Sequence, residues 1–377
     1  MKTALIYTDA YLDYDYGPMH PLRIIRLKLT YELIKAYGLL DLPSVQFIPT
    51  IPAKEEDLTL FHSKDYIAIL KVADDGHLGR EAYAYGLGPG DNPIFSGLFK
   101  WSLLVTGATL QAVDFVADGK GGVAFNIAGG LHHAMPSRAS GFCYTNDPVI
   151  GIMRLVKRGM RVAYIDLDAH HGDGVQKAFY ETDQVLTISL HESGYSLFPG
   201  TGFEYEIGNG KGEGFSVNLP FPAYTDDETY LWAFEEIVPE LIEYFRPDII
   251  VTQLGVDTFE DDPLTHLCLS IYGFEKVIKR IRELSYPWLA LGGGGYEISN
   301  VARAWTLAWA LMNGIKLEEP LPYAYVELAS KHGVLDRELK GQPPNPDRLD
   351  RKTREIRMEM ERIVHYLKRA VFPKVRR

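Results

Sequence analysis

The chain is organised around residues 161–174, which read RVAYIDLDAHHGDG. Val162 to Ile165 form a short apolar run with β-branched and aromatic side chains, which is typical of a buried strand. Asp166, Asp168 and His170 follow at alternate positions, so their side chains lie on one face of an extended chain. A polar strand end that runs into a turn would explain one such pair. Two carboxylates and an imidazole this close need a cation or protons between them, which predicts a site for a divalent ion such as zinc.

Composition and charge narrow the class of protein. With 46% hydrophobic and 24% charged residues, the 377-residue chain has the make-up of a globular protein. Its net charge of −11 argues against nucleic acid as a partner, because nucleic-acid binders present basic surfaces. Cys143 and Cys268 are too few for a disulfide framework or a cysteine-rich zinc site. Since no segment is typical of a signal peptide or a membrane span, we expect a soluble, cytoplasmic protein with no membrane partner.

Strand and helix patterns alternate along most of the chain. Apolar runs predict strands at 2–7, 45–48, 122–127, 162–165, 184–190, 215–219, 248–254 and 288–291. Apolar spacing predicts helices at 24–40, 94–116, 148–158, 175–180, 226–245, 273–284 and 301–312, and two short helices within 54–73, broken near Ser63. Residues 74–93 form a long irregular stretch, which in a compact domain is more often functional than idle. The alternation predicts an α/β fold with one mostly parallel central sheet, helices on both faces, and an active site at the carboxyl ends of the strands.

The end of the chain has a different character. We interpret residues 1–316 as the catalytic domain and residues 317–377 as a C-terminal extension, within which residues 341–346 (GQPPNP) break regular structure. The final segment is rich in Lys and Arg, and its apolar residues share one helical stripe: Met360, Ile363, Val364, Leu367 and Val371. Such a basic amphipathic helix could bind a membrane or a partner. Docking on the acidic domain of the same chain is the commoner arrangement, and it is the one we expect.

Other polar residues follow other predicted strands, so the fold should bring them to the same edge of the sheet. Asp257 lies just beyond the strand at 248–254 and is the natural third metal ligand, although a single carboxylate there could also cap a turn. Three protein ligands leave one position open, which is typical of catalytic rather than structural zinc.

Two adjacent histidines, His132 and His133, follow the strand at 122–127 and suggest imidazoles that act on one reacting centre. Asp166 and Asp173 could orient them and raise their pKa values. Tyr296 follows four glycines, which allow close approach to a ligand and could aim its hydroxyl at a developing oxyanion; a phosphate-binding loop is the weaker alternative, because the run lacks the spacing of such loops. Together these residues predict hydrolysis of an amide by metal-activated water.

Several segments resemble the zinc-dependent histone deacetylase superfamily, in the expected order over nearly all of residues 1–315. They read GDNPIFSGLF, GGLHHAMPSRASGFCYTND, IDLDAHHGDGVQKAFY, LHESGYSLFPGTG and LGGGGYEISNVARAWT. The segments AYGLGPGDNP and DDPLTHL are most similar to the acetoin-utilisation branch of bacterial deacetylases. The resemblance implies an arginase/deacetylase-like fold and a metal-dependent amidohydrolase. The C-terminal extension is the part about which it says least.

The resemblance also implies roles for individual residues. It implies zinc, with Fe²⁺ as the alternative, on Asp168, His170 and Asp257. It implies His133, oriented by Asp173, as general base and acid, His132 paired with Asp166 as its electrostatic partner, and Tyr296 as the group that polarises the acetyl carbonyl. The implied substrate-binding residues are Asp91 at the rim, Phe142 and Phe198 in the walls of a tunnel, Leu264 at its mouth, and Gly294. A structural potassium ion would be held by Asp166, Asp168, His170, Ser189 and Leu190, and Arg26 with Gly129 and Gly130 would line a cavity for released acetate.

The expected activity is therefore hydrolysis of acetyl-lysine in proteins to lysine and acetate. The acetoin-utilisation resemblance implies a metabolic enzyme, such as an acetyl-CoA synthetase, as an acetylated partner. An amidohydrolase for acetylpolyamines or other small amides is the alternative within the family, although the loop insertion usual in those enzymes is not evident. A dinuclear arginase-like hydrolase would need a further carboxylate after Asp257, where Thr258 and Phe259 stand instead. A binding module without activity is the remaining and weakest alternative, and the oligomeric state is left open.

Overall fold

One parallel sheet forms the centre of the molecule in a computed structural model, which describes residues 2–74, 79–88, 90–119, 122–343 and 351–376. Its eight strands lie in the order β2-β1-β3-β8-β7-β4-β5-β6, and every neighbouring pair is parallel. The strands are β1 (Thr3–Tyr7), β2 (Val45–Pro49), β3 (Val123–Asn126), β4 (Val162–Asp166), β5 (Val185–Glu192), β6 (Ser216–Phe221), β7 (Ile249–Gln253) and β8 (Trp288–Leu291). All strands except the edge strand β2 are buried throughout, as expected when helices cover both faces of a sheet. The predicted fold class is confirmed.

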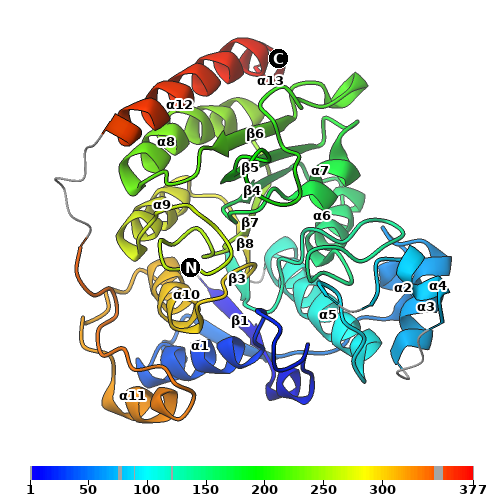
Figure 1. The fold of residues 1–377 in the computed structure, drawn as a ribbon, viewed down its shortest axis with the longest axis vertical. Helices are drawn as coiled ribbons and strands as arrows, with labels where there is room; N and C mark the ends of the chain where they lie inside the picture. Colours follow the sequence, from blue (N-terminus) through cyan, green and yellow to red (C-terminus); the bar gives the residue numbers. More distant parts are fainter. Residues whose placement is uncertain (1, 75–78, 89, 120–121, 344–350, 377) are drawn as a thin grey trace.

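Helices cover the sheet on both faces (Figure 1). One face carries α5 (Leu98–Ala117), α6 (Asp147–Lys157) and α7 (Asp173–Phe179), which contact one another in that order. The other carries α1 (Ile25–Ala36), α10 (Ile298–Met312), α9 (Ile271–Glu283) and α8 (Asp227–Phe245), again in contact in sequence. The shorter helices are α2 (Glu55–Leu58), α3 (Lys64–Asp74), α4 (Glu81–Ala84), α11 (Tyr323–Ser330) and α13 (Phe372–Val375). The register pairs Asp166 of β4 with Gln253 of β7 and Ser189 of β5, so the ends of these three strands meet.

Several predicted helices begin or end elsewhere, including those predicted at 301–312, 273–284 and 175–180, which begin at Ile298, Ile271 and Asp173, and two of the differences have identifiable reasons. The helix predicted at 24–40 ends at Ala36, because Gly38 adopts a φ of 67° and the N–H groups of Gly38 and Leu39 bind the carbonyls of Lys35 and Ile34. The helix predicted at 94–116 begins only at Leu98, after Gly97 at a φ of 83°. The carboxylate of the distant Asp74 accepts a hydrogen bond from Phe99 N there, at 2.6 Å. Such a cap from another segment leaves no local sequence signal.

The C-terminal extension contains α12 (Arg351–Ala370), which packs on α8 and β6 and is followed by α13 (Figure 1). The residues of its apolar stripe are buried: Met360, Ile363, Val364, Leu367 and Val371. Lys368 on the same helix pairs with Glu236 of α8. The domain boundary at residue 316 stays a prediction. Residues 344–346 of the predicted break, and residues 75–78 and 89 of the predicted irregular stretch, lie outside the described residues, and the remainder of that stretch contains α4.

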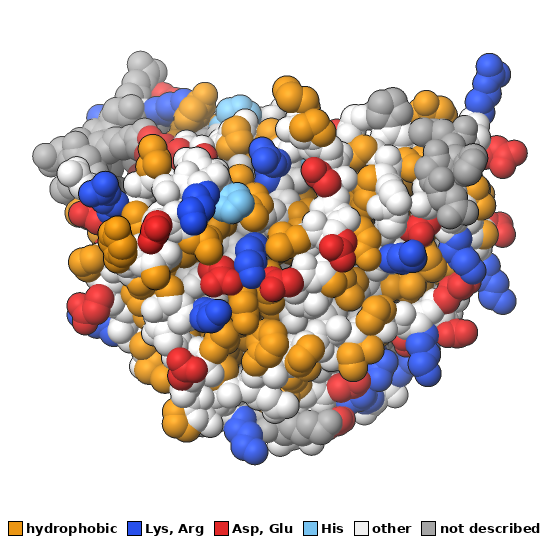
Figure 2. Space-filling model, turned by 90° about the horizontal axis from the view of Figure 1, so that it is seen from below, with side chains coloured by type: hydrophobic (Ala, Val, Ile, Leu, Met, Phe, Trp, Pro, Cys, Tyr) orange, Lys and Arg blue, Asp and Glu red, His pale blue; other side chains and the backbone are white. Residues whose placement is uncertain are grey.

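Two features of the described residues relate to nucleic-acid and membrane partners: the distribution of charges on one face, and the length and apolarity of the helices. Figure 2 shows one face of the molecule, on which acidic and basic side chains are interspersed rather than gathered by sign. This face therefore lacks the continuous basic patch of a nucleic-acid binder among the side chains that are described. None of the helices in the described ranges combines the length and apolarity needed to cross a lipid bilayer.

Candidate active site

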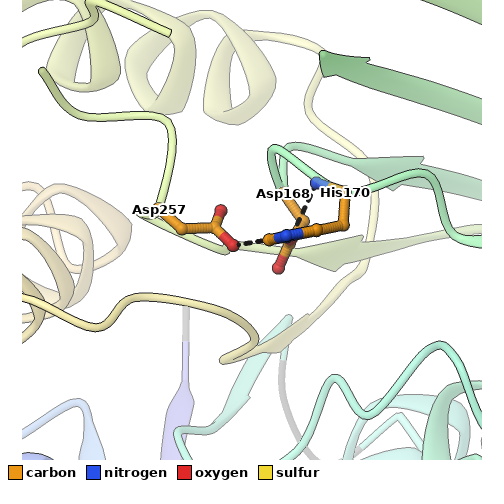
Figure 3. Close-up of side chains that lie close together, drawn as sticks. All are labelled: Asp168, His170 and Asp257. Carbon is orange, nitrogen blue, oxygen red and sulfur yellow. Dashed lines mark hydrogen bonds and ion pairs between the residues drawn. The ribbon is translucent and has the colours of Figure 1, made fainter. Parts of the chain in front are cut away.

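Three buried residues bring potential metal ligands together at the ends of two neighbouring strands. Asp168 and His170 follow β4, and Asp257 follows β7. Their ligand atoms all lie within 4.8 Å of one another. His170 Nδ1 is 3.1 Å from Asp168 Oδ1 and 2.9 Å from Asp257 Oδ2 (Figure 3). The structure thus places the three predicted metal ligands around one point.

The second oxygen of each carboxylate is held by the surrounding chain. Asp168 Oδ2 accepts hydrogen bonds from Gln253 Nε2 at 2.6 Å and from Gly294 N at 2.7 Å. Asp257 Oδ1 accepts one from Ala169 N at 2.8 Å. Each carboxylate therefore turns its other oxygen towards His170, whose N–H donates to Asp168 Oδ1 at 2.9 Å, and its orientation is fixed before an ion binds.

The charges of the cluster also fit a divalent ion. Burial and the nearby charge of Asp168 raise the pKa of Asp257 to about 8. Burial works against the charged forms of Asp168 and His170 too, but the charge of His132 and the hydrogen bond with His170 hold the pKa of Asp168 well below its usual value. Without a cation the two carboxylates repel each other. Two carboxylate oxygens and one imidazole nitrogen match the ligands of mononuclear zinc and iron sites, so the residues fit such an ion.

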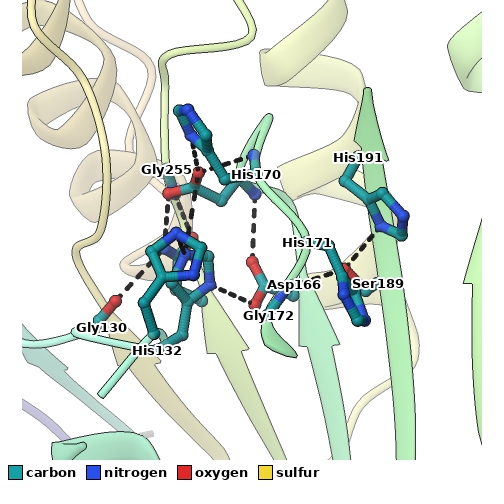
Figure 4. Close-up of polar contacts among 12 residues, drawn as sticks. Gly130, His132, Asp166, His170, His171, Gly172, Ser189, His191 and Gly255 are labelled. Carbon is teal, nitrogen blue, oxygen red and sulfur yellow. Dashed lines mark hydrogen bonds and ion pairs between the residues drawn. The ribbon is translucent and has the colours of Figure 1, made fainter. Parts of the chain in front are cut away.

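Two histidine–aspartate pairs lie beside the metal ligands. His132 Nδ1 is 2.7 Å from Asp166 Oδ2, and His133 Nδ1 is 2.7 Å from Asp173 Oδ1. The two Nε2 atoms face each other at 3.0 Å. Figure 4 shows His132 directed at Asp166, next to the loop that carries His170. Each carboxylate binds the Nδ1 atom of its imidazole, which leaves the Nε2 atom to face the reacting centre.

The two histidines have opposite pKa shifts. Burial lowers the pKa of His132, but the charges of Asp166 and Asp168 outweigh it and raise the pKa to about 9. Burial lowers the pKa of His133, and the charge of His132 lowers it further, against the opposing effect of Asp173. At neutral pH His132 therefore carries the charge and His133 is neutral. A neutral imidazole beside a charged one is suited to accept a proton.

A buried carboxylate that the sequence analysis missed shapes the loop before the histidines. Asp147 accepts hydrogen bonds from Leu131 N at 2.9 Å, from Gly130 N, and from Thr109 Oγ1. Gly130 adopts a φ of 92°, and a Cβ atom there would lie 2.9 Å from the backbone of Gly293. Asp147 stands directly before a proline at the start of a helix, a pattern that predicts a helix start and not a loop anchor.

Hydrogen bonds with three other side chains, those of Asp168, Arg26 and Asp262, hold the glycine run and the backbone of Tyr296 in place. Gly294 N binds Asp168, as described above, and Arg26 donates to the carbonyls of Gly293 and Gly295 at 2.8 Å each. Tyr296 N donates to Asp262 Oδ2 at 2.8 Å. The ring of Tyr296 lies edge-on to that of His170, with centroids 6.4 Å apart. Tyr296 is thus held against the metal ligands by backbone contacts.

Apolar side chains lie between this centre and the surface. The Phe198 ring is 5.1 Å from that of His133, and the Phe142 ring is 5.6 Å from that of Tyr296. A narrow cavity reaches His132, His133 and Tyr296, and Gly141 lines both this cavity and an outer hollow lined by Phe198 and Asp91. Leu264 is half-buried, and its N–H binds Asp262 Oδ1 at 3.0 Å.

Asp91 and the residues predicted for potassium lie farther from the metal ligands. The Asp91 carboxylate is exposed, and its backbone oxygen is 3.2 Å from His20 Nε2. Leu190 is buried in the core, and Ser189 Oγ is 2.8 Å from His191 Nδ1 (Figure 4). Ser189 stands next to Asp166 in the sheet, so the five residues predicted for potassium come from adjoining positions. A potassium ion there stays a prediction.

Gly141 offers a test of how precisely His133 must lie. A Cβ atom at Gly141 would be 2.4 Å from His133 Cδ2, so Gly141→Ala should displace the imidazole. We expect kcat to fall by about a hundredfold, the cost of a small misplacement of a reacting group. Gly159→Ala is the matched control, because Gly159 also has a positive φ but no atom within 4 Å of its Cβ position. If both variants lose only stability, the position of His133 does not limit the reaction.

Comparison with known proteins matches residues 20–312 to a family model described as the histone deacetylase domain. The chain is 42% identical over 332 residues to the acetoin utilization protein AcuC of Bacillus subtilis, which covers 86% of this chain and 85% of that protein. It is 41% identical to histone deacetylase 3 of Oryza sativa, over 85% of this chain and 63% of the rice protein. A solved structure of an HDAC homologue complexed with SAHA has a TM-score of 0.89 and 38% identity, and covers 98% of this chain and 100% of that chain.

Proposed function

Because the chain belongs to the histone deacetylase family and is therefore a metal-dependent deacetylase, we propose that it hydrolyses acetyl-lysine in proteins to lysine and acetate. The observation that carries the proposal is the meeting of Asp168, His170 and Asp257 beside the two histidine–aspartate pairs. Zinc is the proposed ion, with Fe²⁺ as the alternative. When bound, such an ion polarises a carbonyl and lowers the pKa of water.

The proposed roles of the side chains follow from their contacts. His133 Nε2 accepts a proton from the attacking water and later delivers it to the leaving amine, while Asp173 holds the ring in place. His132, kept charged by Asp166, stabilises negative charge that develops next to it. The Tyr296 hydroxyl donates to the carbonyl oxygen of the amide. Phe142, Phe198 and Leu264 enclose the lysine methylenes, and Gly294 contributes to the same wall.

Two further roles are proposed from the family resemblance. A structural potassium ion would lie at the adjoining ends of β4 and β5, near Asp166 and Ser189. Released acetate would pass the glycine loops at Gly129, Gly130 and Gly293, where the buried guanidinium of Arg26 has, within the described part of the chain, only neutral carbonyl groups as hydrogen-bond partners. A buried cation without a carboxylate partner attracts an anion.

The proposed substrate class can be separated from its alternative by turnover. An acetyl-lysine peptide and acetylputrescine would be compared at equal enzyme concentration, with a lysine-acetylated acetyl-CoA synthetase as a protein substrate. Faster turnover of acetylputrescine than of any peptide would favour the small-amide alternative.

Asp91 provides a sharper version of this test. Its exposed carboxylate, at the outer hollow that Phe198 also lines, could accept hydrogen bonds from the backbone amides on both sides of an acetyl-lysine. Asp91→Ala should therefore lower kcat/KM for an acetylated peptide by about tenfold or more, the loss of charge-assisted hydrogen bonds. The same variant should affect a minimal acetyl-lysine analogue much less, because that analogue lacks flanking amides. Equal losses on both substrates would contradict recognition of peptide backbone.

A further inference from the structure

A buried carboxylate with no part in the proposed reaction lies close to the site. Glu192 is the last residue of β5, and its side chain is fully buried. Its two oxygens accept hydrogen bonds from Ser196 Oγ at 2.8 Å and from His266 N at 2.8 Å, and His266 Nδ1 lies 3.0 Å away. Within the described residues no Lys or Arg pairs with it. A buried polar group of this kind is costly unless it is hydrogen-bonded, and these hydrogen bonds join particular segments.

The partners of Glu192 belong to two different loops at the candidate tunnel. Ser196 is in the segment 193–215 between β5 and β6, two residues before Phe198. His266 is in the segment 254–270 between β7 and α9, two residues after Leu264. Glu192 N donates to Ala169 O at 2.8 Å, between the metal ligands Asp168 and His170. One residue thus connects both loops to the strand ends that carry the metal ligands.

We propose that Glu192 is a positioning residue that sets the width of the substrate tunnel by fixing the loops of Phe198 and Leu264 to each other. The inference rests on the proposed function, because it assumes that these two side chains enclose the substrate. The two carboxylate oxygens of Glu192 accept hydrogen bonds from one loop each, so Glu192 restrains the loops more than a side chain without an acceptor would. Removing it leaves His266 N without its acceptor and leaves Ser196 Oγ with only Ser193 O of its own loop, at 3.1 Å.

Other contacts should keep both loops folded when Glu192 is replaced. On the first loop, Glu204 pairs with Arg362 of α12 at 2.8 Å. On the second, His266 O accepts from Tyr224 N at 2.7 Å, and Lys352 of α12 lies over the Tyr224 ring at 3.1 Å. These contacts attach the outer sides of the loops to the C-terminal helix. The loss of Glu192 should therefore shift the loops locally rather than unfold the domain.

Steady-state kinetics of Glu192→Ala tests the proposal with two peptides. One carries acetyl-lysine, and the other carries the same residue with a methyl branch on the carbon next to the amide nitrogen. We expect KM for the unbranched peptide to rise about tenfold while kcat changes by less than about threefold, because positioning and not chemistry is lost. The preference for the unbranched peptide should also fall by about threefold or more, because a wider tunnel discriminates less.

Two comparison variants separate positioning from general stability. Glu192→Gln keeps an acceptor for His266 N and a donor to Ser196 Oγ, and should restore KM to within about twofold of the wild type. Glu275→Ala removes another largely buried carboxylate, which pairs with Lys279 at 2.7 Å and Lys340 at 3.2 Å and lines a groove at the opposite end of β3 and β8. It should lower the thermal midpoint as Glu192→Ala does, with KM and peptide preference unchanged.

The experiment distinguishes failure of the role proposed for Glu192 from failure of the proposed function. If the wild-type enzyme does not hydrolyse the acetyl-lysine peptide, the proposed function fails. If the wild-type enzyme hydrolyses the peptide, either of two results would show that the proposed role of Glu192 is wrong. Glu192→Ala would change neither KM nor the peptide preference, or it would lower kcat alone. Should Glu192→Ala not fold, Ser196→Ala removes a single hydroxyl and should raise KM by about threefold in the same direction. An unchanged KM in a folded Ser196→Ala would equally overturn the proposal.

Discussion

Replacement of Asp257 by alanine is expected to abolish tight binding of a divalent ion and to lower kcat/KM by about a thousandfold or more, since metal catalysis supplies several kcal/mol. The loss leaves only Asp168 and His170 of the three converging ligands. The fold should survive, because Asp257 Oδ1 gives up a single hydrogen bond from Ala169 N. Removal of the aspartate also removes a carboxyl whose burial and repulsion by Asp168 raise its pKa to about 8, so the protein without metal should be no less stable. Elemental analysis and turnover would be measured on the same sample.

Asp261→Ala is the matched control for this prediction. Asp261 lies four residues farther along the same loop, is exposed, and binds Asn300 Nδ2 instead of the metal ligands. Its replacement should leave one ion per chain and near-normal turnover. Two tightly bound transition ions per wild-type chain, or full activity in a metal-free sample, would show that the assignment of a single catalytic ion is wrong.

The convergence of the metal ligands could be predicted because it depends only on a simple rule. Parallel strands end at one edge of the sheet, and β4 and β7 are neighbours in it, so residues that follow these two strands come close. The sequence places Asp168, His170 and Asp257 just after those strands. The same rule brings His132 and His133 to the site, since β3 and β8 end beside them. These predictions needed strand positions, and strand positions follow from apolar runs.

The residues that hold the site in shape could not be predicted in this way. Gln253 is the last residue of a largely apolar strand, and only the structure shows its amide bound to Asp168. Asp262 joins Leu264 N to Tyr296 N, which are far apart in the sequence. Asp147 and Glu192 likewise bind backbone or side-chain groups of other segments. Hydrogen bonds between distant segments leave no periodic signal, so they require the folded chain.

The pairing of each histidine with its aspartate could be predicted only in part from the sequence. The sequence offered Asp166 and Asp173 as partners without deciding between the histidines, and the family resemblance implied one assignment. The structure has Asp166 at 2.7 Å from His132 and Asp173 at 2.7 Å from His133, in line with that assignment. The catalytic roles of the pairs stay proposals until variants are measured.

Replacement of Tyr296 by phenylalanine should lower kcat by about a hundredfold to a thousandfold, the loss of one donor to a developing oxyanion, and leave KM within a few-fold of the wild type. Burial, together with the charges of Asp257 and Asp168, holds the pKa of Tyr296 well above its usual value, so the phenol is a proton donor at all working pH values. Its hydroxyl makes no hydrogen bond within the described residues, whereas its ring packs on Phe142 and its N–H binds Asp262. Phenylalanine keeps those contacts, so the fold should not change.

A second tyrosine supplies the control that makes the Tyr296 result specific. Tyr325 of α11 has a buried hydroxyl without a partner among the described residues, and it lies on the extension, away from the metal ligands. Tyr325→Phe removes the same oxygen and should leave kcat unchanged, with equal or greater thermal stability because an unsatisfied polar group is lost. A Tyr296→Phe enzyme that turned over as fast as Tyr325→Phe would make Tyr296 a packing residue. The oxyanion would then have to be stabilised by another donor, and charged His132, whose Nε2 atom faces the same centre, would be the next residue to replace.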